Sequence, residues 1–162
     1  MQIGLLADTH NKLNKVALAT ERLRGAGIHV VLHAGDVTGP QVLRELSSFN
    51  LWIARGNMDR DPLLGPVAEE LFGHGRFKDI HTLTLEGKNI ALLHGDQRRF
   101  FEELVDSGVY DYVIHGHTHI SRDEQLATTR IINPGALGNV SWRSGSFAIL
   151  DLETGQLEML TV

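Results

Sequence analysis

The feature of this sequence that most constrains its fold is a series of short, continuous apolar runs separated by helical patterns. The first three runs lie at residues 3–7, 28–32 and 51–54. Continuous apolar runs of this length indicate strands that are buried on both faces. Between them, apolar residues recur at helical spacing over 13–23 and 42–46. This alternation predicts an α/β fold with a largely parallel sheet and helices on its faces.

The rest of the chain is less regular. Residues 58–81 contain Pro62, Gly65 and Pro66, which predict a loop or short helical pieces. The further expected elements are a hairpin within 83–93, a helix over 100–105, a strand over 110–114, and antiparallel strands at 125–132, 146–150 and 156–161. A chain of 162 residues has the length of one domain, so we expect a single domain over residues 1–162.

The composition excludes several classes of protein and site. The chain has no cysteine, which excludes disulfides, thiolate zinc sites and a cysteine nucleophile. Its net charge of −5, with only 15 lysines and arginines, disfavours a protein that binds nucleic acid through its phosphates. No apolar run approaches the roughly 18 residues of a membrane span, and the N-terminus lacks the basic stretch of a signal peptide. We therefore expect a cytoplasmic protein without a membrane segment.

Side chains that can bind a metal follow five of the predicted strands at their carboxyl ends. The five segments are Asp8-Thr9-His10, His33-Ala34-Gly35-Asp36, Arg55-Gly56-Asn57, His94-Gly95-Asp96 and His115-Gly116-His117-Thr118-His119. In open α/β sheets, ligands bind outside the carboxyl ends of the strands. If the sheet is mostly parallel, the five segments converge on one crevice. Imidazole and carboxylate groups without thiolates favour a site for divalent transition metals.

The segment from Gly116 to His119 is the most specific of the five. Its alternate histidines can point to the same side of an extended segment, and the preceding glycine lets the backbone approach closely. The other segments are weaker by themselves, because Gly-Asp and Gly-Asn are also ordinary turn dipeptides. It is the occurrence of all five at strand ends that indicates a functional site.

This ordered set of motifs resembles the calcineurin-like metallophosphoesterases. The pattern of that family is Asp-x-His, Gly-Asp, Gly-Asn-His-Asp/Glu, His and Gly-His-x-His, spread over most of the domain. The matching residues here are Asp8 and His10, Gly35-Asp36, Gly56-Asn57 with Asp59, His94, and Gly116-His117-Thr118-His119. The short length and the segment Asn133-Pro134-Gly135 resemble the small single-domain phosphodiesterase branch.

The resemblance implies an α-β-β-α sandwich, in which two packed β-sheets are flanked by helices, with a site for two metal ions. The ligands implied for one ion are Asp8, His10 and His119, those for the other are Asn57, His94 and His117, and Asp36 would bridge the two ions. The implied activity is that of a metal-dependent phosphoesterase, and in the small branch a phosphodiesterase. In that mechanism a metal-bridging hydroxide attacks phosphorus.

The charges of these residues agree with such chemistry. Two divalent ions bring four positive charges, Asp8 and Asp36 return two negative charges, and the other ligands are neutral. A hydroxide and an anionic phosphate would neutralise the remainder. The ligand types suit Mn²⁺, Fe²⁺, Co²⁺, Ni²⁺ or Zn²⁺, of which we expect Mn²⁺. The expected partner is a small phosphorylated substrate, and a homo-oligomer stays open.

One position departs from the family pattern. Met58 follows Gly56-Asn57, where the family commonly has a histidine that would protonate the leaving group or contact the phosphate. A thioether does neither well. The departure leaves the ligand set intact but leaves the proton donor unidentified. Asp59, which would orient such a histidine, is here expected to support the site from behind the ligands or to form a turn.

Two other functions stay open. A protein scaffold on the same fold, as in the retromer subunit that shares it, would act through protein contacts. A scaffold need not keep all seven ligand positions, whereas this chain does. The second alternative is a metal-dependent nuclease, which the net charge of −5 disfavours.

The remaining histidines have plainer interpretations. We expect His33, inside a predicted strand, to be a hydrogen-bonded core histidine or a support for the ligands. His29, His74 and His81 are expected at the surface, and His115 has no assigned role.

Overall fold

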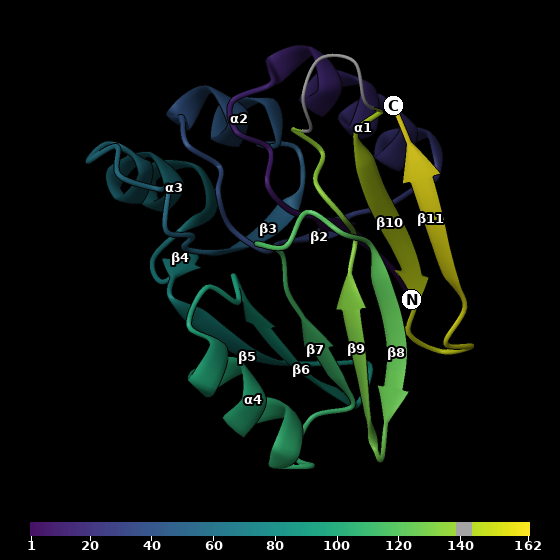
Figure 1. Ribbon diagram of the computed structural model, residues 1–162. Helices are drawn as coiled ribbons and strands as arrows, with labels where there is room; N and C mark the ends of the chain where they lie inside the picture. Colours follow the sequence, from purple (N-terminus) through teal and green to yellow (C-terminus); the bar gives the residue numbers. More distant parts are fainter. Residues whose placement is uncertain (139–143) are drawn as a thin grey trace.

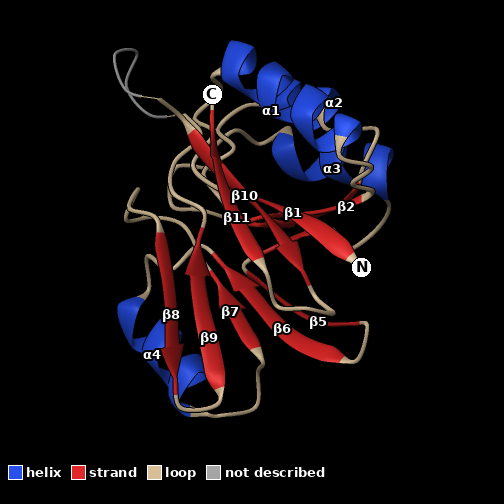
Figure 2. Ribbon diagram, turned by 90° about the vertical axis from the view of Figure 1, so that its right-hand side faces the viewer, coloured by secondary structure: helices blue, strands red, loops and turns tan. Residues whose placement is uncertain are grey.

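The computed structural model describes residues 1–138 and 144–162 and shows four layers (Figure 1). Two β-sheets pack face to face in the centre. Helices α1 (Leu13–Gly25), α2 (Pro40–Glu45) and α3 (Leu64–Phe72) cover the outer face of one sheet, and α4 (Arg98–Asp106) covers the outer face of the other (Figure 2). This is the α-β-β-α sandwich that the family resemblance implies, whereas the apolar periodicity by itself predicted one largely parallel sheet.

Sheet A contains six strands in the order β11-β10-β1-β2-β3-β4. Its strands are β1 (Gln2–Leu6), β2 (Val30–His33), β3 (Asn50–Ala54), β4 (Phe77–Lys78), β10 (Ser146–Asp151) and β11 (Leu157–Thr161). Strands β1, β2, β3 and β4 run parallel, and β10 pairs antiparallel with both β1 and β11. The helices on this sheet are α1, α2 and α3.

Sheet B contains five strands in the order β5-β6-β7-β9-β8. Its strands are β5 (Ile80–Leu85), β6 (Lys88–Leu93), β7 (Tyr112–Ile114), β8 (Arg122–Leu126) and β9 (Thr129–Asn133). Here β6, β7 and β9 are parallel, while β5 and β8 form antiparallel hairpins at the two edges. Helix α4 connects β6 to β7 and packs Phe101 and Val105 against the outer face of the sheet.

The central strands are apolar throughout because each of their faces meets a different core. In β1, Ile3 and Leu5 belong to the core between the two sheets, whereas Leu6 belongs to the core beneath α1–α3. In β2, Leu32 and Val31 divide between the two cores in the same way. The continuous apolar runs are therefore explained by burial on both faces.

One local expectation is confirmed and another is wrong. Residues 64–72 form one of the short helical pieces expected within 58–81, because Pro66 lies in the first turn, where its missing N–H costs no hydrogen bond. Val67 and Ala68 then bury the helix against the core. Residues 125–132 are not one strand, since the chain reverses near Ala127, which has a positive φ of 48°, and β8 returns as β9.

Within the described part of the chain, every helix is too short or too polar to cross a lipid bilayer.

Candidate metal centre

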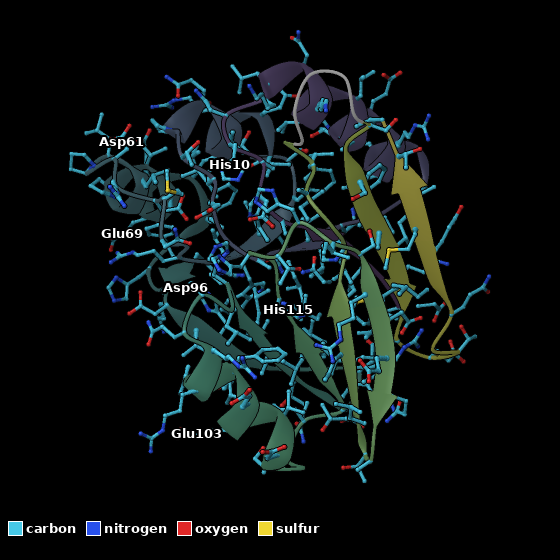
Figure 3. The ribbon with its side chains drawn as sticks, viewed as in Figure 1. His10, Asp61, Glu69, Asp96, Glu103 and His115 are labelled. Carbon is cyan, nitrogen blue, oxygen red and sulfur yellow. The ribbon has the colours of Figure 1, made fainter. Side chains whose placement is uncertain are left out.

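The loops that follow β1, β2, β3, β6 and β7 meet at one end of the sandwich. They bring the seven predicted metal ligands into one cluster, and the expected convergence is therefore observed. The strands come from both sheets rather than from one, so the cluster lies where the carboxyl ends of sheet A face those of sheet B. Figure 3 shows His10, Asp96 and His115 around this central region, whereas Glu103 points outward from α4.

The first group of potential ligand atoms comes from Asp8, His10 and His119, which lie within 4.8 Å of one another. The Nε2 atoms of the two histidines are 3.3 Å apart, and the Nε2 of His119 lies 3.4 Å from Oδ1 of Asp8. These residues come from loops 109 positions apart in sequence, as the pairing of His10 with His119 shows. This group is the ligand set that the resemblance implies for the first ion.

The second group combines Asp8 and Asp36 with His94. The Nε2 of His94 lies 3.5 Å from Oδ1 of Asp36 and 3.1 Å from Oδ1 of Asn57. The other Asp36 oxygen lies 3.8 Å from Nε2 of His10. Asp36 thus lies between the first group and the pair formed by His94 and Asn57.

His117 joins the cluster from the side. Its ring stands edge-on to that of His94, with the centroids 5.1 Å apart. Its backbone N–H donates a hydrogen bond of 3.1 Å to Oδ2 of Asp8. His117 and Asn57 are exposed, whereas Asp8 and Asp36 are buried. The cluster therefore has a buried floor of two carboxylates and an accessible rim.

The buried carboxylates at the floor of the cluster fit a cation. Oδ1 of Asp8 is buried and has no hydrogen-bond donor among the described residues. Burial, followed by the charge of Asp36, raises the pKa of Asp8 to about 8. A carboxylate that is both desolvated and close to a second carboxylate is stabilised in its charged form by a metal ion. The neighbouring imidazoles and the absence of thiolates fit a transition metal.

The backbone of the ligand loops is unusual. Asp8, His10, Asp36, His117 and His119 all have positive φ values, between 43° and 66°. Non-glycine residues rarely adopt this left-handed conformation, because it is strained. Strained backbone of this kind is concentrated at functional sites. The strained conformation turns these five side chains toward a common centre.

Three glycines make room for this packing. A Cβ at Gly35 would overlap the ring of His94, one at Gly56 would overlap Asp36, and one at Gly116 would overlap Oδ2 of Asp8. The glycine in each Gly-Asp, Gly-Asn and Gly-His pair therefore accommodates a ligand from another loop. The turn interpretation of these dipeptides does not explain such contacts.

Asp59 holds two ligand loops together. Its Oδ2 accepts hydrogen bonds from the backbone N–H groups of Gly56 and Asp36, at 2.8 and 3.0 Å, and its Oδ1 accepts one from Thr38 at 2.8 Å. Burial raises the pKa of Asp59, and the backbone hydrogen bonds oppose that rise. Its carboxylate therefore supports Asp36 and Asn57 from behind.

His33 is a buried support. Its Nδ1 accepts the N–H of Gly35 at 3.2 Å, and its Nε2 lies 3.1 Å from the hydroxyl of Thr9. It therefore ties the first ligand loop to the second, as expected for a core histidine. Burial lowers the pKa of His33 to about 3, which keeps the ring neutral.

The orientation of His94 is set by Ala34. Nδ1 of His94 lies 2.8 Å from the Ala34 carbonyl oxygen, which only accepts, so the proton is on Nδ1. The lone pair of Nε2 then faces Asp36 and Asn57. A second hydrogen bond of this kind typically fixes the tautomer of a metal-binding histidine.

Asn133 is a supporting residue that the sequence analysis missed. Its side-chain N–H group donates to the Gly116 carbonyl at 2.8 Å and to the Thr118 hydroxyl at 3.1 Å. Its Oδ1 accepts the N–H of Gly135 at 2.8 Å. The amide thus holds the loop that carries His117, and an Asn-Pro-Gly turn after a strand was the only signal for it.

The other histidines are divided between surface and interior. His29 and His74 are exposed, as expected. His81 is not, because its ring is buried against Trp52 and bonded to the Ile53 carbonyl at 2.8 Å. The surface prediction for His81 is wrong because β5 packs beside β3. His115 is buried as well, and burial lowers its pKa to about 4.

Met58 lies at the accessible rim. Its side chain is 45% exposed, and its backbone N–H donates to Oδ1 of Asp36 at 2.9 Å. The residue therefore contributes to the site through its backbone, and its thioether offers no proton.

Two cavities open beside the cluster. One, of about 470 Å³, is lined by Asn57, His94 and Phe100 among others. The other, of about 530 Å³, is lined by His115, His117 and Phe101 among others. Both volumes are in the range of small-molecule sites.

A methyl group at position 56 should weaken metal binding. In Gly56→Ala, the new Cβ meets Asp36, so Mn²⁺ affinity in a calorimetric titration should fall about tenfold or more, as when outer-shell support is lost. Gly65→Ala is the matched control, because a Cβ there meets nothing within 4 Å. Equal Mn²⁺ affinities for the two variants would contradict the packing role of Gly56.

The burial of His33 should contribute to a loss of stability in acid. Its pKa falls on folding from an ordinary 6.5 to about 3, so this residue binds more protons in the unfolded chain as the pH drops below 6.5. The contribution of His33 to the free energy of unfolding should therefore fall by up to about 1.4 kcal/mol per pH unit through that window.

Denaturant unfolding with chelator present, in steps from about pH 7 down to pH 4, measures this slope. His33→Gln should flatten the slope, whereas His29→Gln, which removes an exposed histidine, is the control. Identical slopes for His33→Gln and the unmodified protein would show that His33 does not carry the effect.

Comparisons with known proteins agree with this geometry. Residues 1–155 match the model of the calcineurin-like phosphoesterase superfamily domain. A phosphodiesterase of Methanocaldococcus jannaschii is 28% identical over 156 residues, covering 94% of each chain. The solved structure of an archaeal phosphodiesterase superposes with a TM-score of 0.93 at 26% identity over the full length of both chains. Zinc-complexed Vps29 of Entamoeba histolytica shares the fold at a TM-score of 0.72 and 18% identity, covering 100% of this chain and 98% of that one. The chain belongs to the calcineurin-like phosphoesterase superfamily.

Proposed function

We propose that this protein is a metal-dependent phosphodiesterase that uses two divalent ions. The proposed ligands are Asp8, His10, Asp36, Asn57, His94, His117 and His119. The observation that carries the proposal is the pair of buried carboxylates, Asp8 and Asp36, surrounded by imidazole nitrogens at 3.4 to 4.0 Å. Family membership and the phosphodiesterase named among the relatives support the reaction class.

Bound ions of this kind supply an activated water and neutralise the charge that develops on phosphate. Asp8 and Asp36 balance part of the ionic charge, and the neutral ligands leave a positive surplus toward the rim. A net positive site explains how a protein of charge −5 would attract a phosphate anion. We propose Mn²⁺ as the working ion, with Fe²⁺, Co²⁺, Ni²⁺ and Zn²⁺ as alternatives that share its ligand preferences.

The burial pattern of the cluster suggests the direction of substrate entry. Asp8 and Asp36 form the floor, whereas Asn57, His117 and His119 are exposed. A phosphate would therefore arrive from the side of those three residues. The proton on Nδ1 of His94 is committed to the Ala34 carbonyl, so His94 is not available as a proton donor in this arrangement.

The retention of all seven ligand positions favours an enzyme over a scaffold. The likeness to Vps29 is at 18% identity and supports the fold alone. A nuclease is disfavoured by the net charge, because phosphate-backbone binding normally needs a basic surface.

The two-ion proposal predicts a stoichiometry. Titration of chelator-treated protein with Mn²⁺ by calorimetry should saturate at two ions per chain, since seven ligands are too many for one tetrahedral site. Asn57→Ala and His117→Ala should mainly weaken the second ion, and Asp36→Ala should weaken both. Hydrolysis of bis(p-nitrophenyl) phosphate should be lost with chelator and return with Mn²⁺ but not Ca²⁺. Saturation at one ion would contradict the two-ion site, and absence of binding would overturn the proposal as a whole.

Met58 predicts a dependence on the leaving group. General acid catalysis contributes about 10²–10⁴-fold, chiefly for poor leaving groups. Without a histidine at position 58, aryl phosphodiesters should be hydrolysed much faster than matched alkyl diesters. Met58→His should narrow this gap by raising the alkyl rate. Rates over a series of esters with graded leaving-group pKa measure the effect. A flat series, with chemistry rate-limiting, would show that another group donates the proton.

A further inference from the structure

A groove runs along the outer face of sheet B between α4 and the hairpin β8–β9. Its wall on α4 includes Phe101 and Val105, and its wall on the hairpin includes Leu126 and Ile131. It also reaches His117, one of the proposed ligands, and the neighbouring Thr118. The groove therefore has apolar side chains on two walls and adjoins the site where phosphate would bind.

His115 lines the groove and lacks a partner for one of its nitrogens. The residue is only 4% exposed. Its Nδ1 lies 3.0 Å from the carbonyl oxygen of Gly116, so Nδ1 carries the proton and Nε2 carries a lone pair. Among the described residues, nothing donates a hydrogen bond to that buried Nε2. A buried acceptor without a donor is costly, and a ligand that brings an N–H or O–H would remove the cost.

An aromatic ring packs on the His115 ring. The ring of Phe101 packs on that of His115, with the centroids 4.7 Å apart and the planes inclined by 58°. The groove therefore has an aromatic side chain, Phe101, in contact with the ring that carries the unpartnered acceptor. An aromatic side chain and an acceptor together favour a planar group that carries a donor at its edge.

Among the described residues, the two arginines of the groove are each already bonded to a glutamate. Arg98 is bonded to Glu102 at 2.8 Å, and Arg122 to Glu124 at 2.8 Å. Asp96 and Asp106 add negative charge to the same lining. A second phosphate is therefore disfavoured in the groove, and an uncharged group is favoured.

The groove is one of two cavities that flank the ring pair of His94 and His117. The other cavity touches His94 and Asn57. A phosphodiester carries two organic groups, one of which departs while the other remains on the phosphate. Two neighbouring cavities at the proposed metal site, which share Gly95 and Asp96 in their linings, offer one space for each group.

We propose that the groove between α4 and β8 binds the organic group that remains on the phosphodiester. In this proposal, Nε2 of His115 accepts a hydrogen bond from an uncharged, planar group with an N–H donor, of the size of a nucleobase. His115 is then a residue that determines specificity. The inference rests on the proposed phosphodiesterase function and adds the chemical class of the substrate.

Three diesters with the same leaving group test this proposal. They are the p-nitrophenyl ester of thymidine 5′-phosphate, its N3-methyl counterpart without the N–H, and methyl p-nitrophenyl phosphate. With Mn²⁺ present, kcat/KM for the thymidine ester should exceed that for the N3-methyl ester by about fivefold, the usual effect of one neutral hydrogen bond. It should exceed that for the methyl ester by more, because the groove adds apolar contacts.

Two variants identify the groove as the cause. In His115→Phe, which keeps a ring but removes the acceptor, the ratio between the thymidine and N3-methyl esters should fall to about one. In Leu126→Trp, at a position that is 40% exposed and so tolerant of change, the advantage of the thymidine ester over the methyl ester should shrink. His81→Phe, which replaces another buried histidine outside the groove, should leave both ratios unchanged.

The possible failures are distinct. Hydrolysis of all three esters at equal kcat/KM would overturn the groove proposal and leave the phosphodiesterase proposal standing. A thymidine preference that survives in folded His115→Phe would overturn the role of His115. Should His115→Phe fail to fold, the ratio between the thymidine and N3-methyl esters in the unmodified protein still decides, because a ratio of one overturns the hydrogen bond. If no ester is hydrolysed with any of the five metals, both proposals fall.

Discussion

The structure depends on the proximity of two buried carboxylates, Asp8 and Asp36. Burial and mutual repulsion raise the pKa of Asp8 to about 8, so without a cation the pair is electrostatically unfavourable. A cation bound at this point between the two sheets would therefore stabilise the cluster. Surrounding imidazoles supply neutral nitrogen ligands instead of competing cationic groups, which fits metal ions as the source of that charge.

The loops that hold those carboxylates together have unfavourable backbone conformations. Other interactions in the sandwich stabilise these loops. Five of the proposed ligands have left-handed backbone conformations, each of which costs of order 1–3 kcal/mol in a non-glycine residue. Asp59, His33 and Asn133 stabilise these loops through hydrogen bonds to backbone groups. The strands from which the loops emerge are anchored in two apolar cores, so the loops start from rigid positions. The packing of the two cores and these hydrogen bonds together offset the strain of the loop conformations.

The proposed chemistry and the proposed specificity come from different parts of the chain. The buried floor of the cluster, Asp8 and Asp36, is formed by the loops after β1 and β2. These two strands lie in the middle of sheet A. The groove beside His117 is lined largely by α4, the loop before it and the hairpin β8–β9. Since α4 lies on the outer face of sheet B and β8 at its edge, they can vary without disturbing the carboxylate pair (Figure 2). One fold can thereby keep its metal chemistry while its organic substrate changes.

The local sequence determined the strands, the residue types at their ends and the family, because double-sided burial and ligand chemistry leave short-range patterns. The five segments that follow the strands could be picked out in this way, whereas the choice of Asp8, His10, Asp36, Asn57, His94, His117 and His119 as ligands came from the family resemblance. Only the tertiary structure decided how they meet. Periodicity could not show that the strands divide between two sheets, nor that Asp8 belongs to both groups of ligand atoms. The roles of Asn133 and the burial of His81 and His115 were equally hidden, because each depends on contacts between segments distant in sequence. Such contacts are set by strand pairing and sheet packing, which no local pattern encodes.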